Sequence, residues 1–262
     1  MESLYKPVIS LHNVTHGFNK KPLFSGITIE IQKGEFIGLI GPNGSGKTTL
    51  LSIINGMVKP WGGNIYINGN KLQNMIPKER AASMSFMMQP EHSLPMFSAL
   101  EVVLTARYPY KRIYMQLTEK DYSIARKMLK YVEMEEFENH DFNTLSAGEK
   151  QLVLFARTLA QESNIILLDE PTSNLDITHK EKILSMAKSL LDEGKTVIAA
   201  IHDLNAAAKY ASRLALLSKG KLSTIGTPDE VLTEQVLSYA YDGKFSRFTN
   251  PVTGKPNICY IP

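Results

Sequence analysis

The sequence has neither the many cysteines nor the long apolar runs that mark secreted disulfide-rich proteins and membrane-spanning proteins. It has one cysteine, Cys259, among 262 residues, so it can form no internal disulfide and no all-cysteine metal site. Its longest purely apolar runs, such as Ile165–Leu168 and Val197–Ile201, are far shorter than the roughly 20 residues of a membrane-spanning helix. The N-terminal segment carries no apolar run of signal-peptide length. These absences argue against a membrane-spanning chain and a secreted disulfide scaffold.

The sequence also has no large excess of positive or negative charge. The chain has 29 Lys and Arg against 26 Asp and Glu, a formal net charge of +3. This balance, without any long block of like charges, argues against a nucleic-acid partner. Hydrophobic residues make up 43% and charged residues 21%, which is close to the average for soluble globular proteins. We therefore expect a cytosolic protein with a well-filled core and either one large domain or two small ones.

The spacing of apolar residues predicts an α/β fold. The pair Asn68-Gly69 predicts a type I′ hairpin turn after a strand at Ile65–Ile67, and Thr118 with Asp121 predicts a capped helix start. In the last third, strands and helices alternate, which favours a parallel sheet covered by helices. The other predicted strands are Val8–Thr15, Leu23–Ile31, Glu35–Ile40, Met84–Met88, Ile165–Leu168, Thr196–Ile201 and Leu214–Leu217, and the predicted helices are 47–55, Ser98–Arg107, Thr118–Val132, one from Ser146, Ile177–Leu191, Leu204–Ala211 and a final one from Thr227.

A glycine-rich loop lies between a predicted strand and a predicted helix. Residues Gly41–Thr48 fit the Walker A pattern G-x-x-x-x-G-K-[ST]. Glycines let backbone N–H groups turn around phosphate oxygens, and the following helix adds its positive end. Lys47 can reach the β- and γ-phosphates and Thr48 can ligate Mg²⁺. The alternative, a plain turn with a solvated lysine, does not explain this context. The predicted nucleotide-binding residues of the loop are Gly41, Pro42, Asn43, Gly44, Ser45, Gly46, Lys47, Thr48 and Thr49.

Two acidic residues end the predicted strand Ile165–Leu168. Ligands bind at the carboxyl ends of parallel strands, so Asp169 is expected to hold Mg²⁺ directly or through water. Glu170 is expected to act as a general base toward an attacking water, a role worth about 10²–10⁴-fold in rate. The plainer interpretation is that the two acids merely close the strand and cap the next helix. A phosphate loop in the same chain favours the catalytic interpretation.

The segment Leu145-Ser146-Ala147-Gly148-Glu149-Lys150-Gln151 resembles the LSGGQ signature of ATP-binding cassette (ABC) proteins. Ser146 and Glu149 also fit an ordinary capping box, but the segment precedes the carboxylate strand as in that family. The resemblance covers nearly the whole chain and implies a P-loop NTPase fold with a RecA-like parallel-sheet core, an N-terminal antiparallel β subdomain and an inserted helical subdomain. It implies one ABC ATPase domain over 1–262, with core and β subdomain near 1–89 and 164–227, helical signature subdomain near 90–163, and C-terminal helix and hairpin at 228–262.

The same resemblance implies roles for further residues. Phe18 resembles the aromatic residue that stacks on adenine, and Gln89 resembles the glutamine that senses Mg²⁺ and the γ-phosphate. Asp176 belongs to a segment similar to the D-loop, and His202 resembles the switch histidine that contacts the γ-phosphate. The implied catalytic residues are Lys47, Gln89, Glu170 and His202; the implied metal contacts are Thr48, Gln89 and Asp169; and the implied nucleotide contacts outside the phosphate loop are Phe18, Ser146, Ala147, Gly148, Glu149 and Asp176.

The signature departs from the family pattern at two positions. Ala147 replaces the first glycine and Glu149 replaces the usual glutamine. Alanine adds one methyl group and keeps its backbone N–H, so we expect ATP to bind, with lower affinity across a dimer interface if the methyl group crowds the nucleotide.

Two segments indicate which group of transporters within the family the chain resembles. The stretch Ala99–Tyr110 is similar to the V-x-L-G-R-Y-P stretch of importers for iron-siderophores, haem and vitamin B12, with Ala106 in place of the glycine. The tail Asn250–Pro256 is similar to the C-terminal hairpin of that group. Manganese and zinc importers share part of the first stretch. The chain holds a single cassette without a long coiled coil, and its end at Pro262 leads us to expect no extra regulatory domain.

The resemblance implies an assembly at the cytoplasmic face of the cell membrane. It consists of a head-to-tail pair of these chains with ATP between them and two integral membrane permease subunits, while an extracellular or periplasmic substrate-binding protein delivers the cargo. Three alternatives stay open at this point: a soluble ABC ATPase without a transport role, an exporter subunit, and a nucleotide-binding regulator without hydrolysis. The last is disfavoured because both Glu170 and His202 are present.

Overall fold

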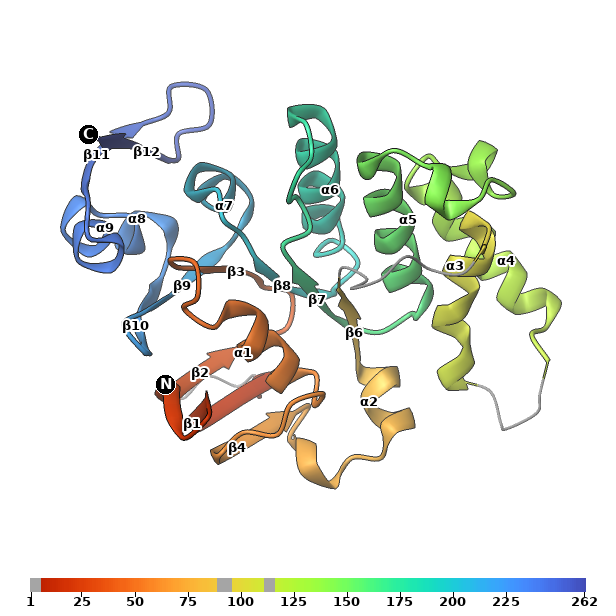
Figure 1. Ribbon diagram of the computed structural model, residues 1–262, viewed down its shortest axis with the longest axis horizontal. Helices are drawn as coiled ribbons and strands as arrows, with labels where there is room; N and C mark the ends of the chain where they lie inside the picture. The colour runs from red at the N-terminus through yellow and green to blue at the C-terminus, as the bar shows by residue number, and fades with distance from the viewer. Residues whose placement is uncertain (1–5, 89–95, 111–115) are drawn as a thin grey trace.

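A six-stranded sheet runs through the middle of the molecule (Figure 1). The computed structural model describes residues 6–88, 96–110 and 116–262. Neighbouring strands of this sheet are parallel, apart from the antiparallel pair β10 and β9. In spatial order the strands are β10 (Lys221–Gly226), β9 (Arg213–Ser218), β3 (Phe36–Ile40), β8 (Thr196–Ala200), β7 (Ile165–Asp169) and β6 (Met84–Met87).

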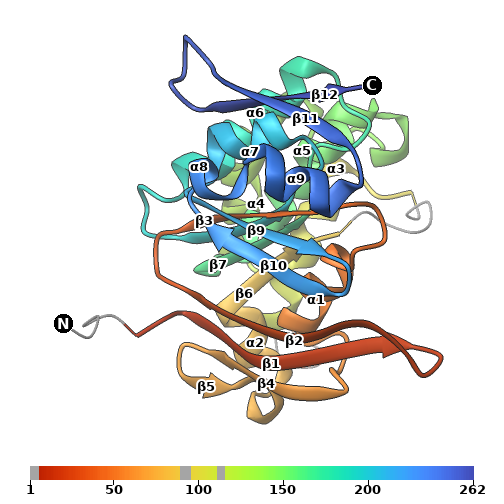
Figure 2. The same ribbon diagram turned by 90° about the vertical axis from the view of Figure 1, so that its left-hand side faces the viewer.

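A smaller antiparallel sheet packs below the first one (Figure 2). Its strands in order are β2 (Lys21–Ile31), β1 (Ile9–Phe18), β4 (Gly62–Ile67) and β5 (Asn70–Lys71). Asn68 and Gly69 join the last two with φ angles of 49° and 78°, which confirms the predicted type I′ turn. Helix α1 (Lys47–Ile54) lies between the two sheets, and its Leu51 and Ile53 are fully buried in the core that they share.

Helices cover the other face of the main sheet and its far edge. Helices α6 (Ile177–Ser189) and α7 (Leu204–Tyr210) lie above the strands, and α3 (Ala99–Leu104), α4 (Glu119–Tyr131) and α5 (Ala147–Ala160) form a group beyond β6 (Figure 1). The predicted cap of α4 is confirmed, since the Thr118 N–H donates to Asp121 Oδ2 at 2.8 Å. The remaining helical segments are α2 (Pro77–Ser83) and the 3₁₀ turns Leu72–Asn74, Thr105–Tyr110, Glu135–Phe137 and Phe142–Thr144.

The C-terminal region differs from its sequence-based prediction. A single final helix was expected from Thr227, but α8 (Pro228–Val231) is one short turn, and α9 (Glu234–Tyr241) begins anew at the Thr233 cap. The expected hairpin is present as β11 (Lys244–Thr249) and β12 (Pro256–Ile261). Strand β10 was not predicted, because its half-exposed residues show no clear alternation.

Within the part of the chain that the structure describes, no helix combines the length and apolar character needed to cross a bilayer.

Candidate nucleotide-binding site

The phosphate loop connects β3 to α1. Gly41 and Gly46 have φ angles of 149° and 96°, conformations that side chains disfavour. A Cβ atom on Gly41 would lie 2.1 Å from the Leu217 carbonyl oxygen, so the loop needs glycine there for space as well. Gly46 is the N-cap of α1 and offers no capping side chain. The N–H groups of the first helical turn therefore remain available to an anion.

Lys47 points back across its own loop. Its side chain is 5% exposed, and its Nζ donates to the carbonyl oxygens of Gly41 at 2.9 Å and Pro42 at 3.2 Å. Burial lowers the pKa of this ammonium group, and the charges of Glu170 and Asp169 oppose that shift. The lysine thus places a buried positive charge within the loop, where phosphate oxygens would compete for its protons.

The environment of the Ser45 hydroxyl indicates whether the loop is suited to bind phosphate. Its Oγ is buried and has no hydrogen-bond partner within residues 6–88, 96–110 and 116–262. A buried polar atom without a partner is costly, and a phosphate oxygen would accept its proton. The loop residues therefore fit a polyphosphate ligand.

A carboxylate faces this loop from the end of β7. The Thr48 hydroxyl donates to Asp169 Oδ1 at 2.9 Å. Burial raises the pKa of Asp169, and the hydrogen bond from Thr48 acts in the opposite direction. A hydroxyl and a carboxylate side by side are hard oxygen ligands of the kind that Mg²⁺ takes together with substrate phosphates. In the described residues no cluster of three His, Cys, Asp or Glu side chains is placed to bind a metal ion.

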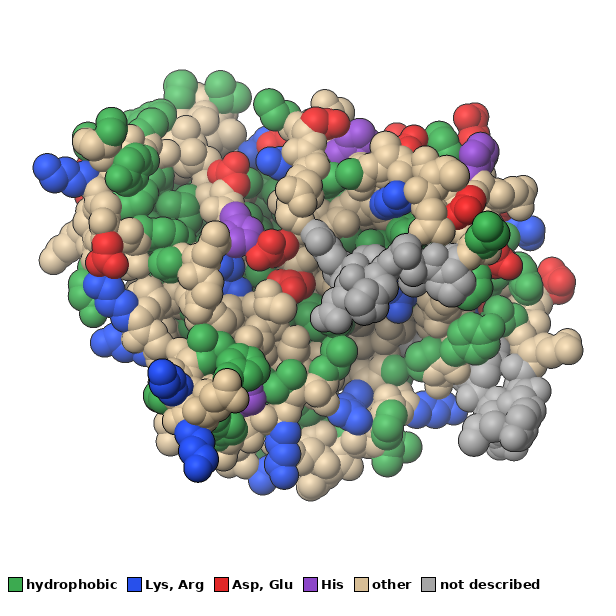
Figure 3. Space-filling view, viewed as in Figure 1, with side chains coloured by type: hydrophobic (Ala, Val, Ile, Leu, Met, Phe, Trp, Pro, Cys, Tyr) green, Lys and Arg blue, Asp and Glu red, His purple; other side chains and the backbone are tan. Residues whose placement is uncertain are grey.

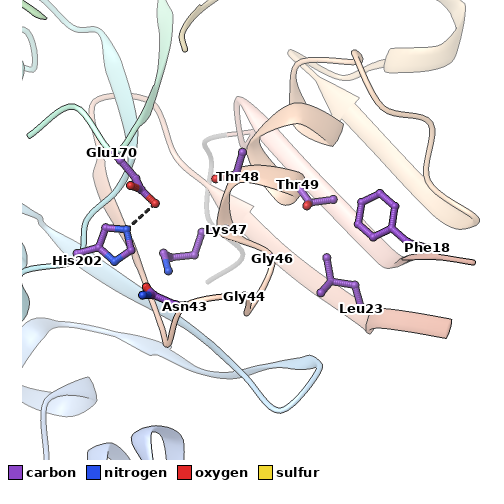
Figure 4. A pocket seen from close by; sticks show the side chains of 10 residues that line it. All are labelled: Phe18, Leu23, Asn43, Gly44, Gly46, Lys47, Thr48, Thr49, Glu170 and His202. Carbon is purple, nitrogen blue, oxygen red and sulfur yellow. Dashed lines mark ion pairs between the residues drawn. The ribbon is translucent and has the colours of Figure 1, made fainter. Parts of the chain in front are cut away.

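Glu170 and His202 form a pair on one side of Lys47, at the left in Figure 4. Nε2 of His202, which follows β8, lies 2.5 Å from Oε1 of Glu170. Glu170 has a φ angle of 47°, unusual for a residue with a side chain. Ser173 stabilises this turn, since its N–H and its hydroxyl both donate to the Glu170 carbonyl oxygen, at 3.1 and 3.2 Å. The strained backbone aims a carboxylate at the phosphate loop, where it can accept a proton from water.

These elements enclose one cavity of about 430 Å³. Phe18, 57% exposed, stands at one side, and Glu170 and His202 stand at the other, with Lys47 between them (Figure 4). The face drawn in Figure 3 gathers acidic and histidine side chains near its middle. The arrangement offers an apolar ring for a base and a cationic loop for phosphates. The lining residues are Phe18, Leu23, Asn43, Gly44, Gly46, Lys47, Thr48, Thr49, Glu170 and His202.

The predicted signature lies apart from this cavity. Ser146 caps α5 and forms a capping box with Glu149, whose carboxylate accepts from the Ser146 N–H at 2.7 Å. Hydrogen bonds from the side chain and then the backbone of Ser146 lower the pKa of Glu149. Asp176 caps α6 and accepts from both the backbone N–H and Nδ1 of His179, at 2.9 and 2.8 Å. None of Ser146, Ala147, Gly148, Glu149 and Asp176 lines the cavity. The chain therefore brings together the phosphate loop, both carboxylates, Phe18 and His202, and leaves the signature on another surface.

Gln89, predicted to contact the metal and the γ-phosphate, lies outside the described residues. Two residues at the site were missed by sequence reasoning. Leu23 lines the cavity beside Phe18, and its side chain lies 2.9 Å from an ideal Cβ on Gly46. Tyr241 of α9 lies beside the Gly41 backbone, and burial raises its pKa to about 12. No local motif marks either residue, because only the fold brings them to the loop.

The comparisons with known proteins agree with this geometry. Residues 24–173 match the family model described as ABC transporter. The ferric enterobactin transport ATP-binding protein FepC of Escherichia coli (strain K12) is 33% identical over 246 residues, covering 94% of this chain and 91% of FepC.

Two solved structures resemble the fold. A transporter described as of the metal-chelate type, in an inward-facing conformation, has a TM-score of 0.86 at 26% identity and covers 98% of each chain. A dimeric post-hydrolysis state of the ATP-binding cassette MJ0796, bound to ADP and Pi, has a TM-score of 0.75 at 34% identity, covering 84% of this chain and 98% of that one. The predicted α/β cassette fold is thus confirmed. The chain belongs to the ABC transporter family and is one of its ATP-binding cassettes.

Proposed function

We propose that this chain is the ATP-hydrolysing subunit of an importer for a metal chelate of the iron-siderophore, haem or cobalamin class. One observation carries the hydrolytic part: the Glu170–His202 pair and Lys47 line one cavity with an exposed aromatic ring at its far side. The transport class is supported by the similarity to FepC and to a transporter of the metal-chelate type.

Each residue of the site has a separate role in this proposal. The N–H groups of the loop and Lys47 bind the phosphates, Phe18 stacks on the adenine, and Thr48 and Asp169 hold Mg²⁺. When bound, Mg²⁺ neutralises charge on the phosphates. Glu170 accepts the proton of the attacking water while His202 orients its carboxylate and contacts the γ-phosphate. Gln89 completes the metal contacts in this proposal.

Two chains complete each site in this proposal. The signature residues Ser146–Glu149 lie outside the cavity of their own chain, and the similar cassette MJ0796 is a dimer with ADP and Pi bound. A head-to-tail pair would bring the helix N-terminus at Ser146 and the Asp176 segment of one chain to the phosphates held by the other. The helical group α3–α5 would then serve as the signature-bearing subdomain.

A permease subunit is proposed to dock in a second hollow. A groove of about 410 Å³ lies between the end of α1, α2, β6 and α5. Its lining combines apolar side chains, among them Met57 and Phe86, with the guanidinium groups of Arg80 and Arg157. Arg80 donates to the Gly56 carbonyl oxygen at 3.0 Å, and Arg157 is an exposed residue of the same groove. This mixture suits an amphipathic segment with an acidic residue, and docking there would hold the chain at the cytoplasmic face of the membrane.

The proposed function is tested by isolation of the tagged chain from its own cells. Co-purification with a polytopic membrane protein, loss of that partner in Arg157→Glu, and its retention in the exposed control Lys33→Glu would support the docking surface. Uptake of a labelled iron-siderophore, haem or cobalamin that stops in Glu170→Gln would support the transport class. An ATPase that purifies without a membrane partner, or neighbouring genes that encode no substrate-binding protein, would contradict the importer.

A further inference from the structure

His16 is a buried histidine whose polar atoms have no partner. Its side chain is 6% exposed, and both ring nitrogens are buried without a hydrogen bond to any atom of residues 6–88, 96–110 or 116–262. A neutral imidazole carries one donor and one acceptor, and an apolar side chain would fill this position without leaving either unmet. Within the described residues, any role of His16 beyond filling space therefore acts through the packing of its ring and not through a hydrogen bond.

The neighbours of His16 are aromatic rings. Its ring centroid lies 5.2 Å from that of Phe18 with an interplanar angle of 87°, 5.8 Å from Trp61 and 6.4 Å from Phe24. The perpendicular arrangement with Phe18 is the edge-to-face geometry that aromatic pairs prefer. Phe18 itself is exposed on one side and lines the nucleotide cavity.

Trp61 and Phe24 connect His16 to the rest of the site. Trp61 crosses the β1–β2 hairpin at Gly17, where an ideal Cβ would lie 2.7 Å from the indole ring. Phe24 reaches the phosphate loop, since an ideal Cβ on Gly46 would lie 2.9 Å from its Cδ1. His16 thus lies between the ring at the base end of the cavity and the ring that supports the phosphate loop.

We propose that His16 is a positioning residue for base binding, which holds the Phe18 ring in the orientation that stacks on adenine. The inference rests on the proposed function, in which Phe18 is the base platform. Phe18 ends β1 and is 57% exposed, so without this contact its side chain would have more rotamer entropy to lose on each binding event. The contact orders the ring before the nucleotide arrives, so it contributes to affinity for the base and not to affinity for the phosphates.

The test compares ATP with inorganic tripolyphosphate, which lacks the base, by calorimetry on the intact protein. Phe18→Ala is expected to weaken ATP binding about tenfold, as the loss of one stacked base predicts. His16→Leu, which keeps the site filled, is expected to weaken ATP binding about threefold to tenfold, as the loss of one aromatic pair predicts, with a higher KM, unchanged kcat and unchanged affinity for tripolyphosphate. In the Phe18→Ala background, His16→Leu should cause no further loss, because both changes remove the same interaction. His16→Phe should restore ATP affinity, since it restores a ring beside Phe18.

His12 supplies the matched control, because it is an exposed histidine on the same strand that contacts Tyr66 at a centroid distance of 5.5 Å. His12→Leu should leave ATP affinity unchanged. Equal losses for ATP and tripolyphosphate in His16→Leu, or an additional loss in the Phe18→Ala background, would reduce His16 to a packing residue and overturn the inference. Unchanged ATP affinity in Phe18→Ala would instead overturn the base platform of the proposed function, and the inference with it. Unchanged affinity in His16→Leu alone would overturn only the inference. Fluorescence of Trp61, the single tryptophan of the chain, reports in each variant whether the ring cluster is intact.

Discussion

Nε2 of His202 lies 2.5 Å from Oε1 of Glu170, although the two residues follow different strands of the central sheet. The pair joins the ends of β7 and β8, which are neighbours in that sheet. A carboxylate in this position can accept a proton from water, and the imidazole fixes which way it points.

Glu170→Gln should retain ATP binding and lose turnover. The amide keeps the shape of the side chain and a hydrogen bond to His202 but cannot take a proton, so we expect hydrolysis to fall about 10²–10⁴-fold. Phosphate release measures the rate, and gel filtration with ATP should show an accumulated dimer. Glu193→Gln, an exposed acid elsewhere on the chain, is the control. A rate like that of the unchanged protein in Glu170→Gln would remove Glu170 from the role of base.

Lys47→Ala should weaken nucleotide binding itself. The change removes a buried positive charge that donates within the phosphate loop, and one lost charged hydrogen bond corresponds to roughly 10- to 100-fold in affinity. Calorimetry with ATP checks the expectation against the exposed control Lys33→Ala. Unchanged affinity in Lys47→Ala would argue that the loop does not hold the phosphates.

Local patterns predicted most of the fold. Positive φ angles at Asn68 and Gly69 and the cap between Thr118 and Asp121 follow from residues close in sequence, and each formed as predicted. The predicted phosphate loop, Asp169 and Glu170 also lie together, because a strand that ends in a polar residue delivers it to the same edge of a parallel sheet as its neighbours.

The unpredicted features depend on contacts between distant segments. Tyr241 reaches the Gly41 backbone from a helix near the C-terminus, and His16 of β1 meets Trp61, which precedes β4. Strand β10 is an edge strand whose pairing with β9, and not its own pattern, defines it. Such contacts leave no periodic mark in the sequence, so only the folded chain reveals them.

Gly148→Ala should destabilise the start of α5. A Cβ atom there would lie 2.6 Å from Cδ2 of His179, whose ring is held by Asp176. Although alanine suits a helix better than glycine, crowding of this kind costs about 1–3 kcal/mol. Urea unfolding of Gly148→Ala, alone and combined with His179→Ala, measures the effect.

The double variant Gly148→Ala with His179→Ala shows whether contact with His179 causes the loss of stability. Once the imidazole is removed, the added methyl group should become neutral or stabilising by about 0.5–1 kcal/mol. His140→Ala, which removes an exposed histidine, should give no such rescue. If Gly148→Ala is equally costly with and without His179, the crowding arises elsewhere and the contact between the two residues does not set the cost.

Tyr241 should make the protein less stable at alkaline pH. Burial raises its pKa to about 12, while an unfolded tyrosine titrates near 10. Between these values the unfolded chain has released the proton that the folded chain keeps, so the free energy of unfolding falls as pH rises, by up to about 1.4 kcal/mol per pH unit.

Tyr241→Phe cannot release this proton, and its stability should fall less steeply. The difference between the free energies of unfolding of the two proteins should therefore shrink by about 1.5 kcal/mol between about pH 10 and about pH 11.5 in urea unfolding. Tyr260→Phe, a change at a 65% exposed side chain, should keep the steep fall, and parallel curves for Tyr241→Phe and the unchanged protein would show that the Tyr241 proton is not held by the fold.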